Sequence, residues 1–153
     1  MADFLEDKNK VIIVGIGNEL KCDDGVGPFI INKLKKKDIE NPNLILIDGQ
    51  TVPENFTGKI KKENPSHIIL IDACVMGCKP GEFKIVNDDD FVNIGISTHS
   101  MSLSYFVKYL KQNNNFKIIF IGIEPKSMDY SDKPTEIVEK GAYEIINIFE
   151  GIL

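Results

Sequence analysis

Four side chains that could bind a metal ion or transfer a proton are spread widely along this sequence; they are Asp24, Asp72, His99 and Glu124. Two carboxylates and an imidazole suit a divalent metal of borderline character, such as nickel or zinc. Water or a partner protein would supply the remaining coordination positions. His99 would bind as a neutral imidazole, and it would need a hydrogen-bond acceptor to fix its tautomer. The sequence thus contains the ligands of an incomplete metal site.

These residues follow or flank predicted strands and helices. Continuous apolar runs predict strands buried on both faces, at residues 11–16, 43–48, 67–72 and 117–123. A shorter alternating run predicts a further strand near a sheet edge, at residues 82–86. Apolar residues spaced three and four apart predict helices at residues 24–37, 54–63, 101–111 and 134–150. Helices therefore alternate with most of the strands.

This order predicts one α/β domain over residues 1–153, in which residues 1–9 form a flexible N-terminus. We expect a single doubly wound, three-layer α/β/α domain with a mostly parallel central sheet of about five strands. In such a sheet, ligands bind beyond the carboxyl ends of the strands. The fold would therefore gather the four candidate side chains at one edge, whereas His67 begins a strand at the opposite edge and receives no role.

Structural explanations compete with the metal site. Asp23 and Asp24 stand where a helix cap or a charge favoured by the helix dipole is expected. Asp72 could end a strand as a turn residue, and His99 could be a hydrogen-bonded loop residue. The turn at residues 15–18 is similar to a phosphate-binding turn, with Asp48 near the place of a ribose-binding acid, but the third glycine of that motif is missing.

Composition excludes several classes of partner. The chain has 18 basic and 23 acidic residues, a net charge of −5, and all of its basic residues are lysines. We therefore expect no nucleic acid and no membrane as partner, and no guanidinium group that clamps an anion. No apolar run is long enough to cross a membrane, and the first ten residues lack the apolar core of a signal peptide. A cytoplasmic location is expected.

The three cysteines, Cys22, Cys74 and Cys78, are an odd number and fit reduced thiols in the cytoplasm. The spacing between Cys74 and Cys78 is longer than in the usual zinc or redox pairs. Each cysteine could add a soft ligand near the metal site or be inert, and we favour inert thiols.

Taken together, several segments resemble the hydrogenase maturation endopeptidases. The similar segments, in chain order, are Gly15–Asn18 with Asp23–Pro28, Leu46–Gly49 with Pro53–Asn55, Ile71–Ala73 with Met76–Gly77 and Pro80–Glu82, Ser97–Leu103, and Phe120–Pro125. They span roughly residues 10–150, and they are most similar to the branch that serves formate-hydrogenlyase-type hydrogenases. The cysteines are a departure, because we do not expect them at these positions in the family.

The resemblance implies an endopeptidase that removes the C-terminal extension of a nickel-loaded [NiFe] hydrogenase large-subunit precursor. It implies that Asp24, Asp72 and His99 recognise the nickel and form the catalytic site. The metal would arrive with the precursor, so no permanent organic cofactor is expected. The precursor would be the protein partner, and the enzyme itself would be a monomer.

Two other functions remain open at this point. The same three ligands would serve a non-enzymatic factor that binds nickel or holds the precursor. The Gly-x-Gly-Asn turn also occurs in peptidyl-tRNA hydrolases, which suggests a nucleotide- or RNA-end-processing enzyme. The acidic balance and the absence of arginine argue against that second alternative.

Overall fold

A computed structural model describes residues 1–87, 96–97, 100–112 and 115–153. Within them, five strands form a sheet in the order β2-β1-β3-β6-β4, and a short sixth strand, β5, pairs with β3. The four parallel strands are β1 (Val11–Ile16), β2 (Leu44–Gln50), β3 (His67–Val75) and β6 (Lys117–Ile123). The predicted doubly wound α/β fold with a mostly parallel sheet is confirmed.

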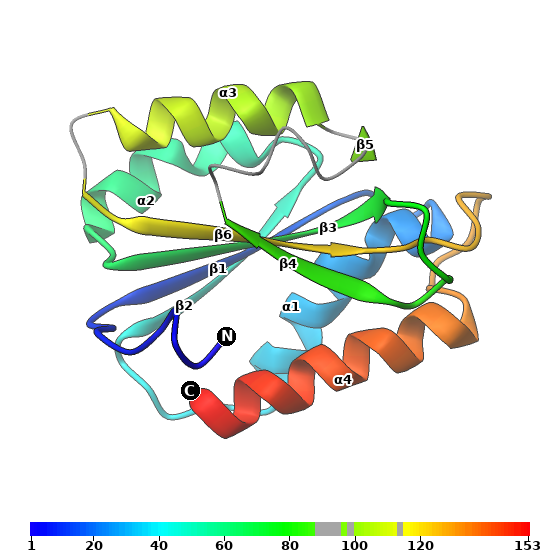
Figure 1. Ribbon diagram of the computed structural model, residues 1–153, viewed down its shortest axis with the longest axis horizontal. Coiled ribbons are helices and arrows are strands. Elements are labelled where there is room, and N and C mark those ends of the chain that lie inside the picture. Colours follow the sequence, from blue (N-terminus) through cyan, green and yellow to red (C-terminus); the bar gives the residue numbers. More distant parts are fainter. Residues whose placement is uncertain (88–95, 98–99, 113–114) are drawn as a thin grey trace.

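Helices cover both faces of the sheet, as Figure 1 shows. On one face lie α1 (Val26–Lys36) and α4 (Glu136–Ile152), and on the other lie α2 (Thr57–Glu63) and α3 (Ser100–Lys111). Each face has its own apolar core, in which Ile31 and Phe149 represent the first face and Ile60 and Phe106 the second. None of the helices in the described ranges has the length and apolarity needed to span a membrane.

The remaining elements differ in detail from the sequence-based expectation. The edge strand β4 (Phe83–Asn87) runs antiparallel to β6. Short 3-10 helices precede α1 and α2, and they are η1 (Cys22–Gly25) and η2 (Pro53–Phe56). The two-residue strand β5 (Ile96–Ser97) was not predicted, because two residues are too few to show a periodic pattern. It pairs with β3 beyond Asp72, which makes β3 longer than expected.

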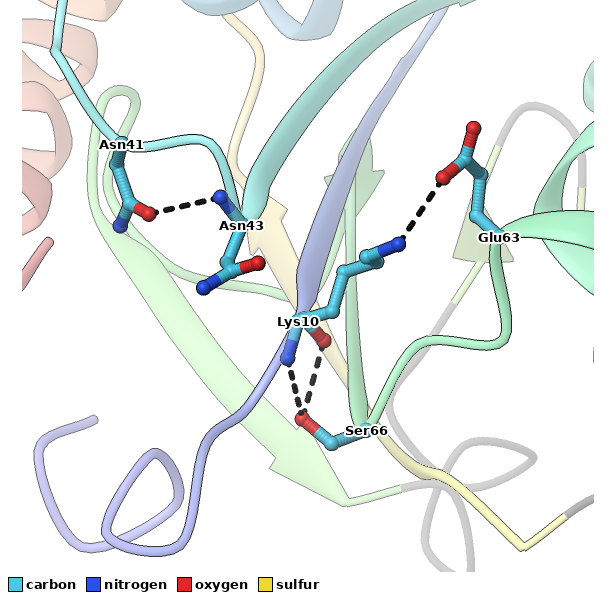
Figure 2. Close-up of polar contacts among 5 residues, drawn as sticks. All are labelled: Lys10, Asn41, Asn43, Glu63 and Ser66. Atoms are coloured by element: carbon cyan, nitrogen blue, oxygen red, sulfur yellow. Dashed lines mark hydrogen bonds and ion pairs between the residues drawn. The ribbon is translucent and has the colours of Figure 1, made fainter.

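Polar contacts close the amino edge of the sheet (Figure 2). The hydroxyl of Ser66, just before β3, accepts a hydrogen bond from the backbone N–H of Lys10 at 3.1 Å and donates to the Lys10 carbonyl at 3.0 Å. The Lys10 ammonium contacts Glu63 at the end of α2 at 3.2 Å. Before β2, the N–H of Asn43 donates to the side chain of Asn41 at 2.9 Å. These groups serve the fold at the edge opposite to the candidate site.

The N-terminal segment also packs at this amino edge. Leu5 is buried in the core, and the ring of Phe4 packs edge-on against His67 with 4.9 Å between centroids. Flexibility of residues 1–9 stays a prediction, but part of this segment contacts the core. Burial, together with the charge of Lys117, lowers the pKa of His67, as expected for a structural imidazole.

Three glycines let the start of α1 lie directly against the carboxyl ends of β1 and β3. A Cβ added at Gly15 would overlap the carbonyl oxygen of Gly27, and one added at Gly17 would overlap that of Asp24. A Cβ at Gly27 would lie 2.7 Å from the carbonyl oxygen of Ile71. Side chains at these positions would push η1 and α1 away from the sheet.

Substitution of Gly27 tests this contact. We expect Gly27→Ala to lower the free energy of unfolding by about 1–3 kcal/mol, because the added methyl meets backbone atoms that cannot move aside. The matched control is Gly58→Ala in α2, where nothing lies within 4 Å of the added Cβ. The control should stabilise the helix by up to about 1 kcal/mol. Urea unfolding of both variants measures the difference, and equal stability would contradict the proposed close packing.

Candidate active site at the carboxyl edge

Asp24 lies in η1, just beyond the carboxyl end of β1. It is buried, and the backbone N–H of Asn18 donates to its Oδ2 at 3.1 Å. The 3-10 helix η1, which carries Asp24, contacts β3, which carries Asp72. The N-cap position of α1 is occupied by Gly25, so Asp23 and Asp24 lie just before the cap, inside η1. This position is compatible with a favourable interaction between their charges and the helix dipole.

Asp72 lies near the carboxyl end of β3 and is fully buried. Its Oδ1 accepts the N–H of Ala73 at 2.8 Å, and in the sheet it pairs with Gly122 of β6. An ionised carboxylate in such a place carries a high desolvation cost, which polar or charged partners must offset. Because β3 continues to Val75, Asp72 lies inside the strand and is not the turn residue at its end.

His99, the third predicted ligand, lies outside the described residues, as does Thr98. The chain on both sides is described. Ser97 of β5 pairs with Cys74 of β3, two residues beyond Asp72, and α3 begins at Ser100. Among the described residues, which do not include His99, no three His, Cys, Asp or Glu side chains are grouped so that they could hold one metal ion.

Asp23 has a role that the sequence did not reveal. It is fully buried, and one of its carboxylate oxygens accepts the backbone N–H groups of Lys126 and Ser127, both at 2.8 Å. The other oxygen accepts the N–H of Thr135 at 2.7 Å, and the Thr135 hydroxyl lies 2.9 Å from both oxygens. Asp23 therefore fastens the loop between β6 and α4 to η1. Its partners are 103 to 112 residues away, so no local pattern could predict them.

Glu124, the fourth candidate from the sequence, lies at the predicted edge but holds a turn. It is buried, and its Oε1 accepts the backbone N–H groups of Met76 and Cys78, each at 2.8 Å. Its own backbone also pairs with the turn before β4, through the N–H of Gly81 and the carbonyl of Glu82. These bonds fix the connection between β3 and β4.

The glycine turn does not have the space of a phosphate site. The backbones of Asp24 and Gly27 fill the positions beside Gly17 and Gly15. Asp48 accepts the N–H of Gln50 at 3.1 Å, and Asp48 and Glu19 both line a cavity of about 360 Å³. A hydrogen bond to Asp48, burial and the Asp48 charge raise the pKa of Glu19. A pair of carboxyl groups repels a phosphate, so the nucleotide alternative loses its support.

Two of the cysteines, Cys22 and Cys74, are buried and have raised thiol pKa values. Burial, together with the charges of Asp72 and Glu124, raises the pKa of Cys74 to about 11. Burial and the charge of Asp23 also raise the pKa of Cys22, whose Sγ lies 3.8 Å from an Asp23 oxygen. Because a thiol binds metal as the thiolate, these shifts favour inert cysteines over additional soft ligands.

Comparison with known proteins identifies similar chains. A family model described as hydrogenase maturation protease matches residues 28–151. A putative hydrogenase maturation protease of Methanocaldococcus jannaschii is 42% identical over 147 residues, covering 92% of this chain and 87% of that protein. The hydrogenase 3 maturation protease of Escherichia coli is 30% identical over 141 residues, covering 92% and 88%.

Solved structures agree with the sequence comparisons. The crystal structure of a [NiFe] hydrogenase maturation protease, HycI, from Thermococcus kodakarensis has a TM-score of 0.84 at 25% identity and covers 99% of this chain and 97% of that chain. The solution structure of the endopeptidase HycI from Escherichia coli has a TM-score of 0.78 at 27% identity, covering 94% and 90%.

The two buried structural carboxylates should respond differently to amide substitution. Asp23→Asn should cost about 2–3 kcal/mol, because both oxygens accept N–H groups and the new amide must turn its own N–H₂ toward a donor. Glu124→Gln should cost less, because its amide oxygen can still accept both N–H groups that Oε1 accepts. Thermal and urea unfolding measure both losses. A larger loss for Glu124→Gln would contradict these assignments.

Proposed function

The chain belongs to the hydrogenase maturation protease family, and from this premise we propose that it removes the C-terminal extension of a nickel-loaded [NiFe] hydrogenase large-subunit precursor. As a member of this family it is a peptidase. We further propose that Asp24, Asp72 and His99 recognise the nickel that the precursor carries. We also propose that the enzyme acts as a cytoplasmic monomer.

The observation that best supports this proposal is the burial of two carboxylates on touching segments. Asp24 on η1 and Asp72 on β3 both lie at the carboxyl edge of the sheet, where doubly wound folds bind their ligands. Two carboxylates can balance the charge of a divalent cation bound between them. Carboxylate oxygens with one imidazole are a suitable ligand set for nickel.

His99 is proposed as the third ligand from the position of its neighbours. Pairing of Ser97 with Cys74 brings the chain before His99 to the carboxyl end of β3. The helix that follows, α3, packs on the same face of the sheet as Cys74. The segment that contains His99 therefore starts next to the strand that carries Asp72 and leads into a helix on the same face of the sheet.

In the proposed reaction, docking of the precursor's nickel on these residues positions the scissile peptide bond at the rim. Water adds to the carbonyl carbon, the C–N bond breaks, and a proton passes to the leaving amine, so no covalent enzyme intermediate is needed. The contribution of the protein is to orient the bond and hold the attacking water next to it. The nickel belongs to the substrate and leaves with the mature subunit.

The non-enzymatic alternative, a factor that only holds nickel or the precursor, does not agree with membership in a family of proteases. Incubating the purified protein with a nickel-loaded precursor separates the two functions directly. A peptidase shortens the precursor, whereas a holding factor leaves its mass unchanged.

Substitution of two proposed ligands tests nickel recognition. We expect Asp72→Asn and His99→Ala each to lower the rate of precursor processing by about 100-fold or more, because each removes a ligand from an already incomplete shell. Asparagine keeps the volume of the buried Asp72 side chain, so the fold should survive. The control is Asp38→Asn, at an exposed position after α1. Mass spectrometry of the precursor measures processing, and undiminished cleavage by both ligand variants would reject the proposed role.

A further inference from the structure

Two exposed apolar side chains lie on loops that are hydrogen-bonded to each other and to η1, which carries Asp24. We propose that Leu20 and Tyr130, here called the docking ridge, bind the precursor polypeptide that surrounds the nickel. The proposal rests on the proposed function, and it adds the surface by which the protein substrate is recognised. Leu20 lies in the loop between β1 and η1, and Tyr130 in the loop between β6 and α4.

The two side chains of the ridge are both largely exposed. Tyr130 is 87% exposed and Leu20 is 65% exposed. One exposed apolar residue needs no explanation, because much of any protein surface is apolar. Here, however, two of them lie on neighbouring loops that the backbone holds together. The arrangement, rather than the exposure alone, indicates a binding surface.

Backbone hydrogen bonds join the two loops. The N–H of Ser131 donates to the carbonyl of Leu20 at 3.0 Å, and the N–H of Cys22 donates to the carbonyl of Ser131 at 3.1 Å. Lys21 and Ser131 thereby form an isolated parallel bridge. Leu20 and Tyr130 each directly precede a bridged residue, so they lie side by side on two adjacent backbone segments.

Asp23 fixes this pair of loops to the site. Its carboxylate holds the N–H groups of Lys126 and Ser127 at the start of the β6–α4 loop and that of Thr135 at the loop's end. Its backbone N–H also donates to the carbonyl of Ser127 at 3.1 Å. A surface that is ordered before binding loses less conformational entropy when a partner binds. We assign Asp23 as a positioning residue for the ridge.

The same loop orders Asp24. The N–H of Asp24 donates to the carbonyl of Lys21 at 3.0 Å, and its Oδ2 accepts the N–H of Asn18 at 3.1 Å. Leu20 therefore belongs to the same hydrogen-bonded turn as Asp24, the proposed nickel ligand. A polypeptide that brings its metal to Asp24 must pass over the surface next to it, and apolar side chains of that polypeptide would bury Leu20 and Tyr130. Exposed tyrosines are frequent anchors at such protein interfaces.

Steady-state processing of the nickel-loaded precursor tests the ridge. We expect the double variant Leu20→Ser/Tyr130→Ala to raise KM by about 10- to 100-fold and to change kcat little, because the ridge binds the substrate without touching the reacting atoms. The matched control is Tyr105→Ala on α3, where the tyrosine is 70% exposed. Asp23→Asn should also raise KM, since it releases the loop, whereas loss of stability alone would lower the amount of active enzyme and hence the apparent kcat.

The possible results separate the two proposals. If the wild-type protein leaves the precursor uncut, the proposed function fails. If the wild type cuts and the double variant keeps its KM, only the ridge proposal fails. An equal rise in KM for Tyr105→Ala would also overturn it, because the effect would not be specific to the ridge. Size-exclusion chromatography gives the last outcome. A wild-type dimer that the double variant dissociates would show that a second copy, rather than the precursor, occupies this surface.

Discussion

The close contact between three glycines and the backbone around them determines the geometry of this site. Gly15, Gly17 and Gly27 leave room for the start of α1 to lie directly on the carboxyl ends of β1 and β3. Because η1 precedes α1 without a break, this contact also fixes where Asp24 lies relative to Asp72. A phosphate-binding turn uses similar glycines to admit a ligand. In this protein the space beside the glycines is filled by the backbone of η1 and α1, and the carboxylate of Asp24 lies at this edge of the sheet.

Two of the acidic residues at this edge hold loops in place through several backbone N–H groups. Asp23 accepts three backbone N–H groups of the β6–α4 loop, and Glu124 accepts two from the β3–β4 turn. These two carboxylates hold the backbone of the loops at the carboxyl edge of the sheet. Asp24 and Asp72 are buried on touching segments, and we propose that they face the substrate's metal. Rigid supports matter because a metal site tolerates little displacement of its ligands.

The sequence predicted the strands and helices well, but it did not predict the long-range hydrogen bonds that join the loops at the carboxyl edge. Strands such as β1 and β6 were placed correctly, because continuous β-branched runs leave little choice other than a buried strand. The edge that collects Asp24, Asp72 and Glu124 followed from the parallel topology alone. The roles of Asp23 and Glu124 did not follow, because their partners are loop N–H groups 46 to 112 residues away. His99 lies outside the described residues, and its role as a ligand stays a prediction.

Anomalous X-ray diffraction at the nickel absorption edge, from crystals soaked with Ni²⁺, tests the proposed metal site most directly. The account predicts one ion at the carboxyl edge, bound by oxygens of Asp24 and Asp72 and by a ring nitrogen of His99, with at least one position left for water or substrate. Nickel bound by the thiols of Cys74 and Cys78 would contradict it, as would Asp24 and Asp72 too far apart to share one ion.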